Sequence, residues 1–171
     1  MRIGKNRTKK KGKAVILIPA AILFFFTILE AAITITVTGS WSLSIGQANL
    51  QGSAGSDLTS YYESTTNQLS MAVDEGRGEH TWRVDVKRID SSWHASLGLY
   101  IKRTNAGTSG KGSVNSGGTE YGLITTSDQT FWTGIGDRAG IYLQEKLDGV
   151  SCAIPAASYS TTLCFTVVQT D

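Results

Sequence analysis

The chain has 171 residues, of which 40% are hydrophobic and 18% are charged, with 16 Lys and Arg against 14 Asp and Glu. Seven of the basic residues lie within the first thirteen positions, so residues 33–171 carry nine basic and thirteen acidic side chains. A net negative body of this kind has no electrostatic footprint for nucleic acid, which is therefore excluded as an expected partner.

The first 32 residues are organised like a secretory signal peptide. The basic segment 1–13 is followed by the apolar run 14–29 and then by Glu30, Ala31 and Ala32. The run is shorter than the roughly 20 residues of a membrane-spanning helix, which favours cleavage after Ala31 or Ala32 over a retained membrane anchor. We expect a hydrophobic leader helix over 1–32, a secreted, cell-surface or periplasmic product, and membrane contact only before cleavage.

Residues 33–45 alternate apolar side chains with Thr and Ser, which is the period of two of a half-buried β-strand. Thirteen residues are long for one strand of a small domain, because typical strands have about five or six. Two interpretations stay open. In the first, a bend at Gly39 takes the chain from one sheet to the other. In the second, residues 33–38 form a donor strand that adds Ile33, Ile35 and Val37 to the sheet of a neighbouring subunit.

Further alternating segments follow, separated by turns rich in Gly, Ser and Asp. They cover 69–73, 82–86, 95–101, 121–125, 141–147 and 159–169. We expect the first two to form a hairpin, 105–118 to be a mobile surface loop, and only Tyr61 and Tyr62 to form a helical turn. Short strands without a long amphipathic helix predict one all-β domain over 33–171, an antiparallel β-sandwich of immunoglobulin-like or jelly-roll-like type.

No group of residues announces a reactive site. The glycine-rich segment 107–113 departs from the phosphate-loop pattern, and no Gly-x-Ser-x-Gly motif is present. His80 and His94 are two imidazoles without clustered carboxylates, which makes a weak metal site. We therefore expect no enzyme activity, catalytic residue, cofactor or metal.

Cys152 and Cys164 are both in the exported part, close together in sequence. In an oxidising compartment we expect them to form a disulfide, which stabilises a short loop by roughly 3 kcal/mol. The alternative is a pair of buried thiols on neighbouring strands.

The tryptophans are the side chains most open to a binding role, because exposed indole rings stack on sugars. Trp41 and Trp82 lie on apolar parities and are predicted core residues. Trp132, between turn signals and next to Phe131, is predicted to be exposed. Phe131, Trp132 and Trp93 are the candidate contacts for a glycan or another partner.

The leader, the alternating first strand, the Ser-, Thr- and Gly-rich body and the closing segment 159–168 resemble fimbrial and spore-coat-type surface subunits. That resemblance implies a polymerising, non-enzymatic β-sandwich. The leading hypothesis is thus a secreted or surface-displayed structural protein, a subunit of a pilus, fibre or coat, which associates with itself or with other surface proteins. The alternative is an extracellular carbohydrate-binding or adhesive module that uses exposed aromatic side chains.

Overall fold

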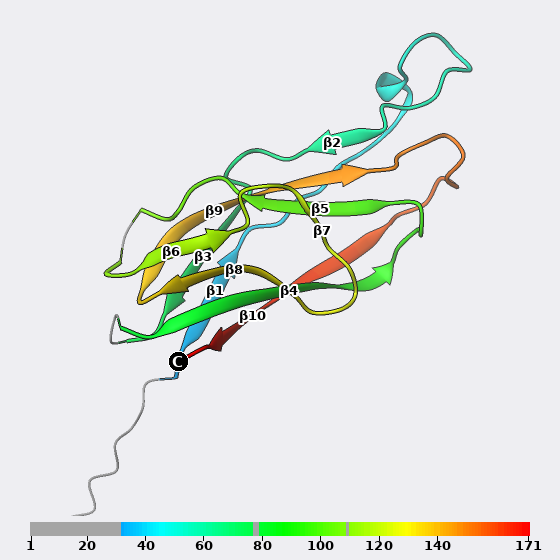
Figure 1. Cartoon of the computed structure of the whole chain (residues 1–171). Helices are drawn as coiled ribbons and strands as arrows, with labels where there is room; N and C mark the ends of the chain where they lie inside the picture. Colours follow the sequence, from blue (N-terminus) through cyan, green and yellow to red (C-terminus); the bar gives the residue numbers. More distant parts are fainter. Residues whose placement is uncertain (1–31, 77–78, 109) are drawn as a thin grey trace, which may run out of the picture.

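Two antiparallel sheets make up the computed structural model, which describes residues 32–76, 79–108 and 110–171 (Figure 1). The predicted leader helix lies outside these residues. The strands are β1 (Thr34–Thr38), β2 (Tyr61–Glu63), β3 (Leu69–Asp74), β4 (Thr81–Ser92), β5 (Gly98–Arg103), β6 (Ser113–Gly117), β7 (Gly122–Leu123), β8 (Gln129–Ile135), β9 (Arg138–Asp148) and β10 (Ser160–Gln169), with a single 3₁₀ turn, η1, at Gln47–Asn49.

The strands are divided between a six-stranded and a four-stranded sheet. In the first, the order is β1-β3-β9-β5-β7, and β2 also pairs with β9; in the second, the order is β10-β4-β8-β6. The all-β prediction is confirmed, and the arrangement is consistent with the predicted β-sandwich. Within the described ranges no helix is long and apolar enough to cross a membrane.

One core lies between the two sheets. Its fully buried side chains come from β3, β5 and β9 on one side and from β4 and β8 on the other, and they include Trp82 and Trp132. The Trp82 indole N–H donates to the carbonyl of Gly136 at 2.8 Å. Gly134 lies against the same indole so closely that a Cβ atom there would collide with the ring. The core prediction for Trp82 is confirmed.

The predicted hairpin of 69–73 and 82–86 is wrong, because β3 and β4 belong to different sheets. Their connection crosses the end of the body, where one carboxylate oxygen of Asp137 accepts the N–H groups of Glu75 at 2.8 Å and Gly76 at 3.1 Å. Alternation correctly gave each strand its buried face. Both buried faces contact the same core, but they do so from opposite sheets.

Two further predictions are corrected. The segment 105–118 contains β6, which pairs with β8, so it is not simply a surface loop. Tyr61 and Tyr62 lie in β2, paired with Asp148 and Leu147 of β9, and not in a helical turn.

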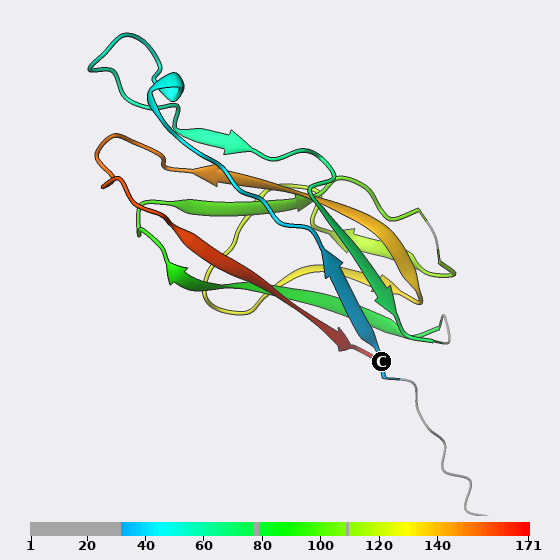
Figure 2. The same ribbon diagram turned by 180° about the vertical axis from the view of Figure 1, so that it is seen from behind.

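The beginning of β1 and the C-terminus lie side by side at one end of the body, as both ribbon views show (Figures 1 and 2). Hydrogen bonds hold the C-terminal residues against the start of β4. Thr170 donates its N–H to the carbonyl of Thr81 at 2.9 Å, and the Asp171 carboxylate accepts the N–H of Thr81 at 3.0 Å. β1, at the edge of one sheet, also lies beside β10, at the edge of the other.

Candidate functional site

β1, the candidate donor strand, is seated in its own domain. It is antiparallel to β3, with Ile35 opposite Val73 and Val37 opposite Met71. Ile33, Ile35 and Val37 pack, partly buried, against the shared core, and the threonines between them are exposed. In the part of the chain that the structure describes, β1 pairs with β3 alone and forms the edge of its sheet.

Gly39 ends this strand. Its φ of +115° lies in the region that favours glycine, and a Cβ atom there would collide with the carbonyl oxygen of Gln68. The Gln68 side chain in turn donates to the carbonyl of Ser40. The predicted crossing to the other sheet is wrong: the strand ends before Gly39, and residues 40–46 form no strand and lead to η1.

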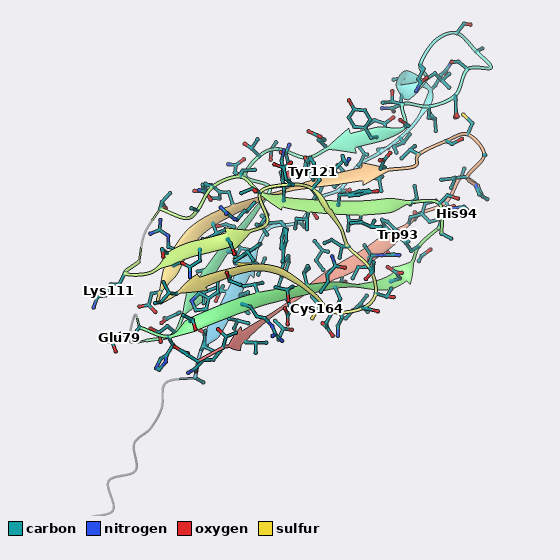
Figure 3. The ribbon with its side chains drawn as sticks, viewed as in Figure 1. Glu79, Trp93, His94, Lys111, Tyr121 and Cys164 are labelled. Atoms are coloured by element: carbon teal, nitrogen blue, oxygen red, sulfur yellow. The ribbon has the colours of Figure 1, made fainter. Side chains whose placement is uncertain are left out.

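The predicted exposure of Trp132 is wrong, because its side chain is 1% exposed and belongs to the core. Phe131 is partly buried against that core, with its ring centroid 4.5 Å from that of Trp132. Trp93 is half-buried, donates its indole N–H to the carbonyl of Leu97 at 3.0 Å, and lies at the far end of β4 (Figure 3). The three residues do not form one binding surface.

The sequence analysis did not identify the aromatic side chains that do reach the surface. Tyr61 is 55% exposed and Tyr142 is 36% exposed, and both lie on the outer face of the six-stranded sheet. The signal was present in β9, where Tyr142 has the parity opposite to the core residues Ile141 and Leu143.

In the structure Cys152 and Cys164 form no disulfide with each other, and both are free thiols. Cys152 is exposed in the connection between β9 and β10, where its N–H donates to the Asp57 carboxylate at 2.7 Å. Hydrogen bonds from the N–H groups of Cys152 and Leu58 and from the Ser151 hydroxyl lower the pKa of Asp57. Cys164 lies within β10 opposite Lys87, and an extended strand advances about 3.3 Å per residue, so the strand carries it away from that connection.

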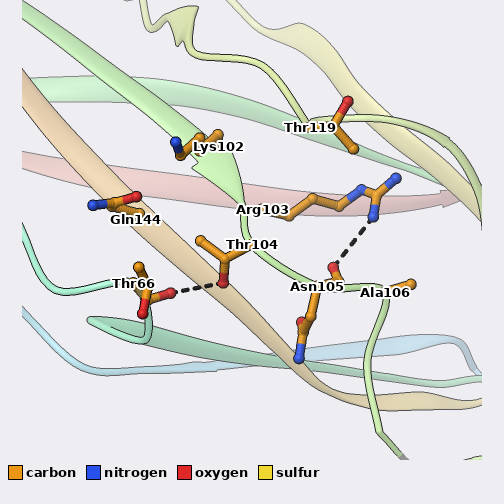
Figure 4. Close-up of a pocket in the computed structure, with 8 residues that line it drawn as sticks. All are labelled: Thr66, Lys102, Arg103, Thr104, Asn105, Ala106, Thr119 and Gln144. Carbon is orange, nitrogen blue, oxygen red and sulfur yellow. Dashed lines mark hydrogen bonds between the residues drawn. The ribbon is translucent and has the colours of Figure 1, made fainter.

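A concave pocket of about 410 Å³ lies where β5 ends (Figure 4). Its lining residues come from four separate parts of the chain and comprise Thr66, Lys102, Arg103, Thr104, Asn105, Ala106, Thr119 and Gln144. Two of them are cationic and the others are neutral. Lys102 and Arg103 leave the strand on opposite sides, as expected for neighbours in β-structure.

The Tyr121 ring lies between two ammonium groups beside this pocket. Lys102 Nζ is 4.3 Å from the ring centroid and Lys146 Nζ is 5.1 Å from it; Lys146 Nζ also lies 4.5 Å from the Tyr100 ring. Burial and the nearby Glu63 carboxylate raise the pKa of Tyr121 to about 12, so the phenol stays neutral at physiological pH. The face of a neutral phenol attracts cations.

A carboxyl group is buried on the inner face of β9. Glu145 is 7% exposed, lies opposite Ile101 of β5, and has one carboxyl oxygen without a hydrogen-bond partner among the described residues. Its backbone is fixed by Ser64, whose hydroxyl accepts the Glu145 N–H at 2.8 Å. Desolvation raises the pKa of Glu145 to about 7.

The two histidines cannot share a ligand. His80 precedes β4 and His94 follows it, so the length of the strand separates them. His80 Nδ1 lies 3.4 Å from the Asp171 carboxylate, and the His94 ring packs against Tyr159 with centroids 6.0 Å apart. Over the described ranges, no three His, Cys, Asp or Glu side chains are grouped to hold a metal ion.

The sequence and the structure were also compared with known proteins. Comparison with family models, curated proteins and solved structures found no match.

Proposed function

We propose that this chain is a secreted or surface-displayed, non-enzymatic structural subunit, a β-sandwich of immunoglobulin-like or jelly-roll-like type, whose copies join into a pilus, fibre or coat by exchanging β1. One observation carries the proposal. β1 is an edge strand next to the predicted cleavage site, it pairs within the described residues with β3 alone, and a glycine with positive φ separates it from the rest of the body.

Exchange of β1 preserves every contact of the closed subunit. The seat beside β3 accepts Ile33, Ile35 and Val37 equally well from its own chain or from a second copy. When each copy donates β1 to the next and receives β1 from the previous one, the contact is head-to-tail and does not close on itself. Strand addition of this kind gives a filament in which each link uses the contacts that hold β1 in its own domain.

The seat is weak enough to open. Full burial of an Ile or Val side chain stabilises a fold by about 1.5–3 kcal/mol, and the three side chains of β1 are only partly buried. Their release therefore costs roughly 3 kcal/mol, which corresponds to an open fraction of about one in a hundred. Exchange does not require the other strands to unfold.

Cysteine pairs placed in β1 and β3 test the exchange directly. Thr36 and Ala72 are directly opposite each other, at the spacing of cross-strand disulfides. In a background with Cys152→Ser and Cys164→Ser, one preparation of the mature protein carries Thr36→Cys and another carries Ala72→Cys. After mixing and oxidation, we expect disulfide-linked chains that contain one copy of each variant.

A control pair and a locked variant make the result decisive. Ser70 and Tyr142 are opposite each other in β3 and β9, inside the sheet, so Ser70→Cys and Tyr142→Cys preparations should not become linked. The double variant Thr36→Cys/Ala72→Cys, oxidised before assembly, should stay monomeric by light scattering and form fibres in electron micrographs only after reduction. Absence of mixed disulfides, together with a mature protein that stays monomeric at every concentration, would refute the proposal.

The adhesive alternative requires a different surface from the one predicted. Because Trp132 is buried, a carbohydrate-binding or adhesive role would instead use the polar pocket at the end of β5 and the neighbouring tyrosines.

A further inference from the structure

The pocket at the end of β5 is lined by two cationic side chains, Lys102 and Arg103. Residues 33–171 carry more acidic than basic side chains, yet among the residues that the structure describes neither Lys102 nor Arg103 forms an ion pair. Four other basic side chains, Arg83, Lys87, Arg88 and Lys146, do lie within 4.0 Å of a carboxylate.

The walls of the pocket are held in place by hydrogen bonds. The Thr104 hydroxyl donates to the carbonyl of Thr66 at 2.7 Å, and Arg103 donates to the carbonyl of Asn105 at 3.2 Å (Figure 4). The Asn105 amide donates to the carbonyl of Gly140 at 2.9 Å, which ties this wall to β9. A wall fixed in advance costs a ligand little ordering entropy.

Arg138 anchors the same wall from the outside. Its guanidinium donates to the carbonyls of Ala106 at 2.7 Å and Gly107 at 2.6 Å. Arg103 likewise donates to the carbonyl of Gly117 at 2.6 Å, which leaves Lys102 as the cation with the fewest internal partners. The Glu63 carboxylate lies 3.5 Å from the Gln144 side-chain nitrogen and is not among the residues that line the pocket.

We propose that this pocket binds an acidic saccharide, with a sugar carboxylate on Lys102 and sugar hydroxyls on the polar wall. The volume of about 410 Å³ lies within the range of about 300–1,000 Å³ of ligand pockets. Threonine hydroxyls and the Gln144 amide are donors and acceptors of the kind that sugar hydroxyls need. The Tyr121 ring keeps the Lys102 ammonium at the pocket without neutralising its charge.

Titration calorimetry with a short oligogalacturonate tests this inference, and a neutral galactose oligosaccharide of the same length is the matched ligand. We expect the acidic oligosaccharide to bind at least about tenfold more tightly than the neutral one, because a charge-assisted hydrogen bond is lost with the carboxylate. Its affinity should also fall as salt is added.

Three variants locate the site. Lys102→Gln should weaken binding at least about tenfold, whereas Lys102→Arg, which keeps the charge, should retain it within a few-fold. Lys111→Gln makes the same charge change at an exposed position at the end of the body, away from Tyr121, and should have no effect (Figure 3). The urea midpoint of each variant serves as the check on folding.

Each remaining outcome would overturn the inference. These outcomes are no binding of the oligogalacturonate, equal binding of the neutral sugar, equal losses for Lys102→Gln and Lys111→Gln, or tighter binding of a short poly-glutamate peptide than of the sugar. Strand exchange is measured by disulfide formation between β1 and β3, so none of these sugar-binding outcomes bears on it.

Discussion

Replacement of Glu145 by glutamine tests the most unusual ionisable group of the body. Its carboxyl is 7% exposed on the inner face of β9, opposite Ile101, and burial raises its pKa from 4.5 to about 7. The folded protein therefore prefers the protonated, neutral form. Glu145→Gln keeps the shape of that form and removes the ability to ionise.

The shift sets the sign and size of the effect. Because the folded pKa is above the unfolded one, the contribution of Glu145 is complete below about pH 4.5 and is lost as the pH rises through about 7. Each pKa unit corresponds to about 1.4 kcal/mol, so the rise from 4.5 to about 7 makes the whole loss at most about 3.5 kcal/mol. Between about pH 5.5 and 8 we expect the free energy of unfolding to fall by about 2 kcal/mol.

Urea unfolding followed by tryptophan fluorescence, at low protein concentration and several pH values, measures this change. Between about pH 5.5 and 8, the stability of Glu145→Gln relative to the parent protein should rise by about 2 kcal/mol. Glu120→Gln, at an exposed carboxyl, is the control and should follow the parent curve at every pH. If the Glu145→Gln and parent curves stay parallel, the carboxyl is already ionised in the folded state and the reasoning fails.

Two further predictions concern packing and the cysteines. Gly134→Ala places a methyl group against a core indole and should destabilise the body by about 2 kcal/mol or more in urea, whereas Gly46→Ala, which meets nothing within 4 Å, should change stability by less than about 0.5 kcal/mol. Cys152 and Cys164 should react with a thiol reagent in the native state, with the exposed Cys152 reacting faster, and intact mass measured without reductant should show two free thiols; a mass lower by two hydrogens would contradict this.

Strand positions were predictable from the sequence because burial follows side-chain parity. In β3, Leu69, Met71 and Val73 are buried and the residues between them are not, as the alternation requires. Alternation gives the face of a strand but not its partner, which explains why the β3–β4 hairpin was wrong. The pairing depends on which sheet each strand completes.

Trp132 shows how a single residue type can mislead. Gly134 resembles a turn residue, and a turn there would place the nearby Trp132 indole at the surface. In the structure Gly134 lies within β8, where the absence of a side chain makes room for Trp82. The glycine marks close packing inside the body, and this depends on a contact between two strands.

The pocket at the end of β5 had no sequence signal at all. Its lining residues are separated by long stretches of chain, and each is an ordinary polar residue where it stands. Only the register of β5 with β9, which places Lys102 opposite Gln144, brings two of the walls together.

The start of β1 and the C-terminus lie side by side, so one pole of the body carries both and the opposite pole carries neither (Figures 1 and 2). Any anchor or tag joined to either terminus leaves by the same route. The distal pole is formed by η1 and the connection that contains Cys152 (Figures 1 and 2). A subunit attached in this way presents the same distal surface whichever of its two ends is fixed.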